Sequence, residues 1–252
     1  MKKANFHVRQ VAGYGLGNFI MTTPAIQMMA DHFDVKVPVI FHDGYITEFY
    51  EQCPFLYQIP RSQMKETRCV FTTAQVNYRI SDIIHFVSRA KKRLGISKKY
   101  PIKHPYVDAL PSPRNDEYTV IIWGNASKGS VAVKKDVGSD IYKYILDRID
   151  GPVVLVGNTR DYKERLKGLL KHKNCDLVLD KTKEILGLIN GAKRVIANDS
   201  GLYHVSAALK KPTFVIWKDT WFEKNREPGK NMFYSQKGNW QKDFVSWRNS
   251  EA

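Results

Sequence analysis

The chain has 252 residues, of which 43% are hydrophobic and 12% aromatic. This apolar content excludes a disordered chain, because enough surface can be buried to offset the loss of chain entropy. At this length one large core or two small ones can form, and we expect two compact halves. The 40 Lys and Arg against 25 Asp and Glu give a net charge of +15. Such a charge favours a polyanionic partner, although it can also serve solubility alone.

The sequence contains no apolar run of the roughly 18 residues that a membrane-spanning helix needs. Its opening residues, Met1–Ala4, lead into an expected strand and not into a signal-peptide core. We therefore expect a cytoplasmic protein without a membrane span, in the bacterial host cytoplasm if it is phage-encoded. Cys53, Cys69 and Cys175 are too scattered for a disulfide framework or a zinc site, so we expect reduced thiols and no bound metal.

Apolar runs alternate with amphipathic segments along the whole chain, which is typical of βα units and a mostly parallel sheet. In the first half the pattern predicts three strands and two helices. The strands are Phe6–Val11, Val35–Phe41 and Arg68–Thr73, and the helices are Phe19–Phe33 and Ile80–Leu94. Four prolines between Pro101 and Pro113 then interrupt regular structure, as in a linker. We place the domain boundary there, with domains at 1–112 and 113–252.

The same alternation restarts in the second half. It predicts strands at Tyr118–Trp123, Pro152–Val156, Arg194–Ala197 and Pro212–Trp217, and helices at Asp140–Ile149, Arg160–Leu170, Lys183–Ile189 and Leu202–Leu209. The chain after Trp217 is polar, aromatic and basic. We expect two Rossmann-like, doubly wound domains that face a central cleft, where loops from the carboxyl ends of the strands can meet.

Two strand-to-helix loops have the composition of ligand-binding loops. Gly13, Gly15 and Gly17 follow the first strand, but their spacing is not that of a dinucleotide fingerprint, and a plain turn explains them as well as a phosphate cradle does. Asn198-Asp199-Ser200-Gly201 joins a strand to a helix whose free N–H groups would attract an anionic diphosphate, with His204 one turn further on. A helix cap beside a packed histidine is the alternative.

The second of these loops lies within a longer resemblance. The C-terminal half resembles the C-terminal signature of the ADP-heptose:lipopolysaccharide heptosyltransferases, glycosyltransferase family 9. The residues that carry this resemblance are Ile185–Ala192, Val195–Gly201, His204, Ala207-Ala208 and Lys211–Thr213. The segment Gly15–Ala25 is similar to the N-terminal signature of that family, and Val153–Gly157 to its central strand and glycine. The resemblance implies an α/β fold of GT-B architecture, with an acceptor-binding N-terminal domain and a nucleotide-sugar-binding C-terminal domain.

The resemblance also implies an inverting transfer and donor binding without a metal. The absence of any Asp-x-Asp sequence, which would bridge a metal to a diphosphate, agrees with this. Carried over by position, the implied donor-binding residues are Ser127, Lys128, Lys134 (or Lys135), Gly157, Glu184, Asp199, Ser200, Gly201 and His204. Glu184 would accept a hydrogen bond from the ribose and Lys134 would meet the phosphates, the alternative for both being a solvated helix face.

One position departs from the family pattern. Where the family carries an Asp after Gly-x-Gly, thought to deprotonate the acceptor hydroxyl, this chain has Asn18, whose amide cannot act as a base. His42 and Asp43 follow the second predicted strand and are candidate replacements. A His-Asp-Gly sequence is also typical of an ordinary turn.

The acceptor is the least determined part of the function. A dense positive stretch comprises Arg89, Lys91, Lys92, Arg93, Lys98 and Lys99. Basic groups among aromatic rings suit phosphate contacts and base stacking. Small size and positive charge resemble the phage enzymes that glycosylate 5-hydroxymethylcytosine, so our first hypothesis is transfer from a UDP-sugar to a flipped base in DNA.

Two alternatives remain open at this point. One is a heptosyltransferase-like enzyme of lipopolysaccharide or surface-glycan synthesis, whose positive charge would meet acceptor phosphates and the membrane surface. The other is a non-catalytic protein that lost its base at Asn18 and only binds a nucleotide sugar or nucleic acid. In each case the expected ligand is a UDP- or ADP-linked sugar, with no further cofactor.

Overall fold

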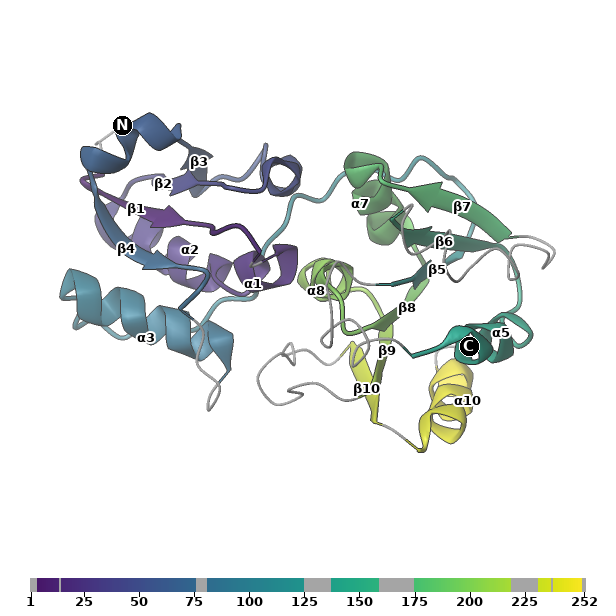
Figure 1. The fold of residues 1–252 in the computed structure, drawn as a ribbon. Helices are drawn as coiled ribbons and strands as arrows, with labels where there is room; N and C mark the ends of the chain where they lie inside the picture. Colours follow the sequence, from purple (N-terminus) through teal and green to yellow (C-terminus); the bar gives the residue numbers. More distant parts are fainter. Residues whose placement is uncertain are drawn as a thin grey trace. The chain divides into compact units, whose positions relative to one another are not determined.

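The computed structural model describes residues 4–13, 15–75, 81–124, 137–158, 175–218, 231–236 and 238–250. Contacts within the chain define an N-terminal unit, with its main boundary at Asp108, and a C-terminal unit that begins at Ala109. Each unit is built on a parallel sheet (Figure 1). The predicted α/β class is therefore confirmed.

The N-terminal unit contains a four-stranded sheet in the order β3-β2-β1-β4, with every neighbouring pair parallel. Its strands are β1 (Phe6–Arg9), β2 (Val37–Ile40), β3 (Leu56–Gln58) and β4 (Arg68–Thr72). Its helices are α1 (Leu16–Ile20), α2 (Thr23–Phe33) and α3 (Asp82–Leu94), and two 3₁₀ turns are η1 (Gly44–Phe49) and η2 (Arg61–Lys65). In Figure 1, α2 and α3 pack together against the sheet.

The single helix predicted over Phe19–Phe33 is interrupted, and the break separates α1 from α2. The hydroxyl of Thr22 donates to the Phe19 carbonyl and that of Thr23 to the Ile20 carbonyl, each at 2.7 Å. These bonds satisfy the last carbonyls of α1. Pro24 lies in the first turn of α2, where a missing N–H costs nothing.

The C-terminal unit contains a six-stranded parallel sheet in the order β10-β9-β8-β5-β6-β7. Its strands are β5 (Thr119–Ile122), β6 (Val153–Gly157), β7 (Cys175–Leu179), β8 (Arg194–Asn198), β9 (Thr213–Trp217) and β10 (Met232–Gln236). Its helices are α5 (Ser139–Leu146), α7 (Thr182–Gly191), α8 (Gly201–Ala208) and α10 (Trp240–Ser250). The helix predicted at Arg160–Leu170 lies outside the described residues.

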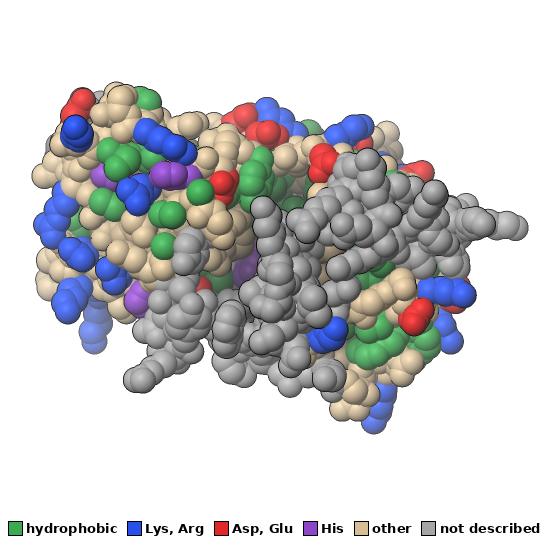
Figure 2. Space-filling model, in the orientation of Figure 1, with side chains coloured by type: hydrophobic (Ala, Val, Ile, Leu, Met, Phe, Trp, Pro, Cys, Tyr) green, Lys and Arg blue, Asp and Glu red, His purple; other side chains and the backbone are tan. Residues whose placement is uncertain are grey.

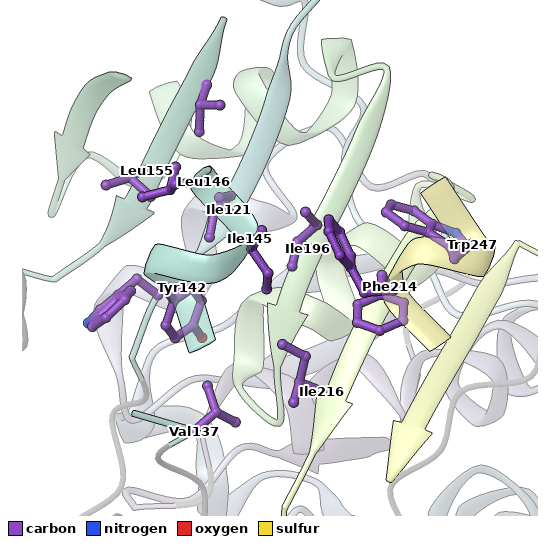
Figure 3. Close-up of a cluster of buried hydrophobic side chains, with 13 residues drawn as sticks. Ile121, Val137, Tyr142, Ile145, Leu146, Leu155, Ile196, Phe214, Ile216 and Trp247 are labelled. Atoms are coloured by element: carbon purple, nitrogen blue, oxygen red, sulfur yellow. The ribbon is translucent and has the colours of Figure 1, made fainter. Parts of the chain in front are cut away.

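A hydrophobic cluster joins the sheet of the C-terminal unit to α5 and α10 (Figure 3). Ile121, Ile196 and Phe214 come from the central strands, and all three are fully buried. Trp247 of α10 lies 5.4 Å from Phe214 between ring centroids. A parallel sheet covered on both faces needs such nearly continuous apolar strands, which explains why the central strands could be predicted.

The proline-rich segment packs on both units. Asp108 is buried, and its carboxylate accepts a hydrogen bond of 2.7 Å from the Gln52 backbone in the N-terminal unit. Two residues later, the carbonyl of Leu110 accepts one of 2.8 Å from the Asn190 side chain of α7. A Cβ on Gly187 would lie only 2.5 Å from the Pro111 carbonyl oxygen. The segment is therefore held by specific contacts on each side of the boundary.

Candidate active site

The strand order of the C-terminal sheet creates a topological switch point between β5 and β8. β6 and β7 lie beyond β5 on one side, and β9 and β10 lie beyond β8 on the other. Connections from the carboxyl ends of β5 and β8 therefore leave in opposite directions. In doubly wound sheets ligands bind at this point. Asp199 and Ser200 follow β8 directly, so the segment predicted to bind the donor lies at the switch point.

The residues around the start of α8 are polar and buried. Asp199, Ser200 and His204 are 2%, 6% and 5% exposed, and the His204 ring packs 4.1 Å from that of Tyr203. Ser200 is the N-cap of α8 in an extended conformation, but its side chain makes no capping hydrogen bond. Within the described part of the chain its Oγ is buried without a partner.

A buried hydroxyl without a hydrogen bond costs about 1–3 kcal/mol. The backbone N–H groups of the first turn of α8 likewise have no acceptor within the helix. A bound anion at this end of α8 would satisfy both kinds of donor and would gain from the helix dipole. The start of α8 is therefore suited to a phosphate group.

Other predicted donor residues lie at the same carboxyl edge of this sheet. Glu184 is in the first turn of α7, where its carboxylate is 2.9 Å from the ammonium of Lys181. Gly157 ends β6, and a Cβ there would be 2.8 Å from the carbonyl oxygen of Trp123. Packing between strand ends thus accounts for this glycine. Ser127, Lys128, Lys134 and Lys135 lie outside the described residues.

The N-terminal sheet has its own switch point, between β1 and β4. At the carboxyl end of β1, buried Gln10 accepts hydrogen bonds from the backbone N–H groups of His42 (2.7 Å) and Asp43 (2.9 Å). Its amide nitrogen donates to Oδ2 of Asp43 at 2.7 Å. Gln10 therefore fixes the backbone of this loop and orients the Asp43 carboxylate. Sequence reasoning missed it, and the only available signal was a polar residue ending a buried strand.

The loop that carries Asp43 lies against the glycine-containing segment. The Tyr45 hydroxyl is 3.6 Å from where a Cβ on Gly15 would be. Burial, and then the charge of Asp43, raise the pKa of Tyr45. Asn18 is half-buried within α1, two residues after Leu16, whose backbone hydrogen-bonds to Tyr45. The structure thus brings the Asp43 loop and the start of α1 together.

His42 differs from Asp43 in its surroundings. Loss of hydration, followed by the positive charges of Arg61 and Arg9, lowers the pKa of His42 below its usual 6.5. Its Nε2 is buried and has no hydrogen-bond partner among the described residues. Its surroundings therefore favour the neutral imidazole.

The predicted nucleic-acid-binding residues do not lie at either carboxyl edge. Arg89, Lys91, Lys92 and Arg93 belong to the second half of α3, and Lys98 and Lys99 follow it as exposed residues. Lys98 lies over the Tyr100 ring, 5.2 Å from its centroid. In the described ranges, no helix is long and apolar enough to span a membrane, and no three acidic, His or Cys side chains are grouped as metal ligands.

Comparison with known proteins gives the family context of these sites. Residues 141–245, from α5 into α10, match the model of glycosyltransferase family 9 (heptosyltransferase). This match confirms the predicted resemblance. No sequence among the curated proteins matches the chain. The matched family 9 region contains Glu184, Asp199 and His204, and therefore the whole segment around the start of α8.

Three solved structures show the same fold. The Escherichia coli ADP-heptose lipopolysaccharide heptosyltransferase II has a TM-score of 0.77 and 12% identity, covering 97% of this chain and 98% of that chain. The family 9 glycosyltransferase of Veillonella parvula gives 0.72 and 11%, with 97% and 89% covered. The E. coli heptosyltransferase WaaC with ADP gives 0.69 and 14%, with 98% and 100% covered.

The family match and the fold together identify a glycosyltransferase of GT-B architecture, as predicted. They do not support our first hypothesis for the acceptor. The matched family and the two E. coli structures are of the heptosyltransferase type, so the comparisons favour the heptosyltransferase-like alternative over 5-hydroxymethylcytosine in DNA. The first hypothesis rested on positive charge and small size, and neither of these properties describes a site.

Proposed function

We propose that this protein is an inverting, metal-independent glycosyltransferase that moves a heptose-like sugar from an ADP-linked donor to a hydroxyl of lipopolysaccharide or another surface glycan. The observation that carries the proposal is the start of α8, where a buried polar segment at a switch point falls within the heptosyltransferase family match. The choice of ADP over UDP is supported by the similar structure of WaaC, which was solved with ADP.

The donor would lie with its diphosphate at the start of α8. In the transition state the bond between the sugar and the diphosphate breaks, and negative charge grows on the departing phosphate oxygen. The α8 N–H groups and the Ser200 hydroxyl are fixed donors that stabilise this charge as it forms. No metal is required for that task when such donors are already oriented.

Asp43 is our proposed general base in place of Asn18. Its carboxylate takes the proton of the acceptor hydroxyl, whose oxygen attacks the anomeric carbon as the nucleoside diphosphate leaves from the opposite face. Three observations support the assignment: the carboxylate is oriented by Gln10, the loop lies against Gly15, and the Nε2 of His42 is buried. His42 would then hold the loop and not transfer the proton.

A transfer assay tests the proposal. The protein is incubated with labelled ADP-heptose or UDP-glucose and with truncated lipopolysaccharide or 5-hydroxymethylcytosine DNA, each with and without EDTA. We expect label to move from ADP-heptose to lipopolysaccharide, with equal rates in EDTA. Transfer only to DNA would contradict the proposed acceptor and support our first hypothesis. Donor binding without transfer to any acceptor would favour the non-catalytic alternative.

A further inference from the structure

Four cationic side chains line a hollow of about 360 Å³ in the N-terminal unit. Arg68 is the first residue of β4, and Arg89, Lys92 and Arg93 belong to the last two turns of α3. Figure 2 shows Lys and Arg side chains gathered along the left edge of the molecule, over this end of α3. Three residues of the basic stretch noted in the sequence thus form a concave site with Arg68, a residue that the sequence did not single out.

None of the described residues that line this hollow is acidic. Among the described residues, none of its four cations forms an ion pair, although other Lys and Arg side chains do. The Nε of Arg89 is buried without a hydrogen-bond partner in the same part of the chain. Like charges held together repel, and an unpaired buried guanidinium N–H carries a desolvation cost. A bound anion would remove both penalties.

The side chain of Cys69, next to Arg68 on β4, lies in the electric field of several arginines. Burial raises the pKa of its thiol, while the positive charges of Arg9, Arg93 and Arg89 act in the opposite direction. Three guanidinium groups therefore lie near one side chain of β4. The Nε of Arg9 is likewise buried without a partner among the described residues. Of the cations that line the hollow, Arg68, Lys92 and Arg93 are exposed and Arg89 is half-buried.

The hollow lies at the opposite edge of the sheet from the proposed base. Arg68 pairs with Phe6 at the amino end of β1, whereas Gln10 and Asp43 lie at the carboxyl ends of the strands. Four residue steps along a strand separate the two edges by roughly 13 Å. An anion in this hollow would therefore bind apart from the reacting hydroxyl.

We propose that this hollow binds a phosphate-bearing ligand with two or more negative charges, at a site separate from the transfer site. Arginine forks pair with phosphate oxygens in a bidentate manner, which suits a diphosphate or a phosphomonoester. Its volume is at the lower end of the range for small-molecule pockets, so it suits one such group better than a nucleic-acid duplex. This proposal does not depend on the proposed function.

Isothermal titration of the full-length chain with pyrophosphate tests the site. Lys92→Gln/Arg93→Gln removes two lining charges, and Lys98→Gln/Lys99→Gln removes two exposed charges that do not line the hollow. We expect Kd to rise at least about tenfold in the first variant and to stay within about twofold in the second. Arg68→Gln gives an independent loss, and thermal unfolding without ligand confirms that each variant is folded.

Pyrophosphate can also occupy the proposed donor site, so Ser200→Ala is titrated in parallel. Binding that survives Ser200→Ala but fails in Lys92→Gln/Arg93→Gln supports the hollow, whatever the outcome of the transfer assay. Vesicles with and without phosphatidate show whether the phosphate belongs to a lipid headgroup or to a soluble ligand. Equal weakening in both double variants, or duplex DNA that displaces pyrophosphate, would overturn a discrete phosphate site.

Discussion

Replacing Gly187 with Ala tests whether the glycines of the family 9 segment serve the fold or the ligand. A Cβ at this position in α7 would lie 2.5 Å from the Pro111 carbonyl oxygen and 3.4 Å from Cδ of Pro113. Contacts of Cβ atoms below 3.0 Å essentially do not occur, so the linker or α7 must move by about 0.5 Å. Overpacking of this kind costs about 1–3 kcal/mol.

The net effect includes a gain from helix propensity. Ala is favoured over Gly within a helix by about 1 kcal/mol. The nearest atom is a backbone oxygen that cannot rotate away, so we take the upper part of the overpacking range. We expect Gly187→Ala to lower the free energy of unfolding by about 1–2 kcal/mol and the Tm by roughly 2–8 °C.

Thermal unfolding followed by circular dichroism measures the change in Tm, with Gly44→Ala as the matched control. Gly44 is not in the left-handed region, and no atom lies within 4 Å of its Cβ position. That variant should remain within about 0.5 kcal/mol of the wild type. If Gly187→Ala were as stable as the wild type or more so, the contact between the linker and α7 would not be the reason for the glycine.

Two further predictions concern the proposed base and its loop. Asp43→Asn should lower kcat about 10²–10⁴-fold in a steady-state assay, with little change in donor KM. Asp34 is an exposed carboxylate at the end of α2, so Asp34→Asn should leave kcat unchanged in the same assay. An unchanged kcat in Asp43→Asn would exclude Asp43 as the base. The pKa of His42 is lowered below 6.5, so on acidification the unfolded chain binds a proton at this side chain more readily than the folded chain does. The Tm should therefore fall as the pH drops through about 6.5, and it should fall less in His42→Gln. A wild-type Tm that rises on acidification from pH 7.5 to 5.5 would contradict the assigned surroundings of His42.

The parts of the fold that could be predicted from the sequence are its buried central strands. β5, β6, β8 and β9 are nearly continuous apolar runs because both faces of a parallel sheet are covered. The edge strands β7 and β10 mix polar and apolar residues and were missed. Side chains of an edge strand are less buried than those of a central strand, so the apolar pattern of an edge strand is weaker.

Helix α10 shows a second reason for a missed element. Its sequence was interpreted as a polar, aromatic and basic tail. Only Phe244 and Trp247 are buried in it, yet their spacing of three residues places both on one helix face against Phe214. Two large rings can anchor a helix whose remaining side chains face solvent, and a short apolar stripe of this kind is easily overlooked.

The candidate site divides in a similar way. The segment from Asp199 to His204 was identified because a strand, a cap residue and a helix follow one another locally in the sequence. The role of Gln10 depends on partners more than 30 residues away, and Arg68 joins α3 only through the packing of β4. Such long-range combinations leave no local pattern, so they become visible only in the folded chain.

The central claim is that an ADP-linked donor binds at the start of α8, and a direct titration with ADP tests it. Isothermal titration should show ADP binding that is unchanged by EDTA and at least about tenfold tighter than UDP binding. Ser200→Ala should weaken it about tenfold, because the phosphate loses the hydrogen bond that the buried Ser200 hydroxyl would donate. ADP binding that was absent, or that was unaffected by Ser200→Ala, would contradict the assignment of the donor site.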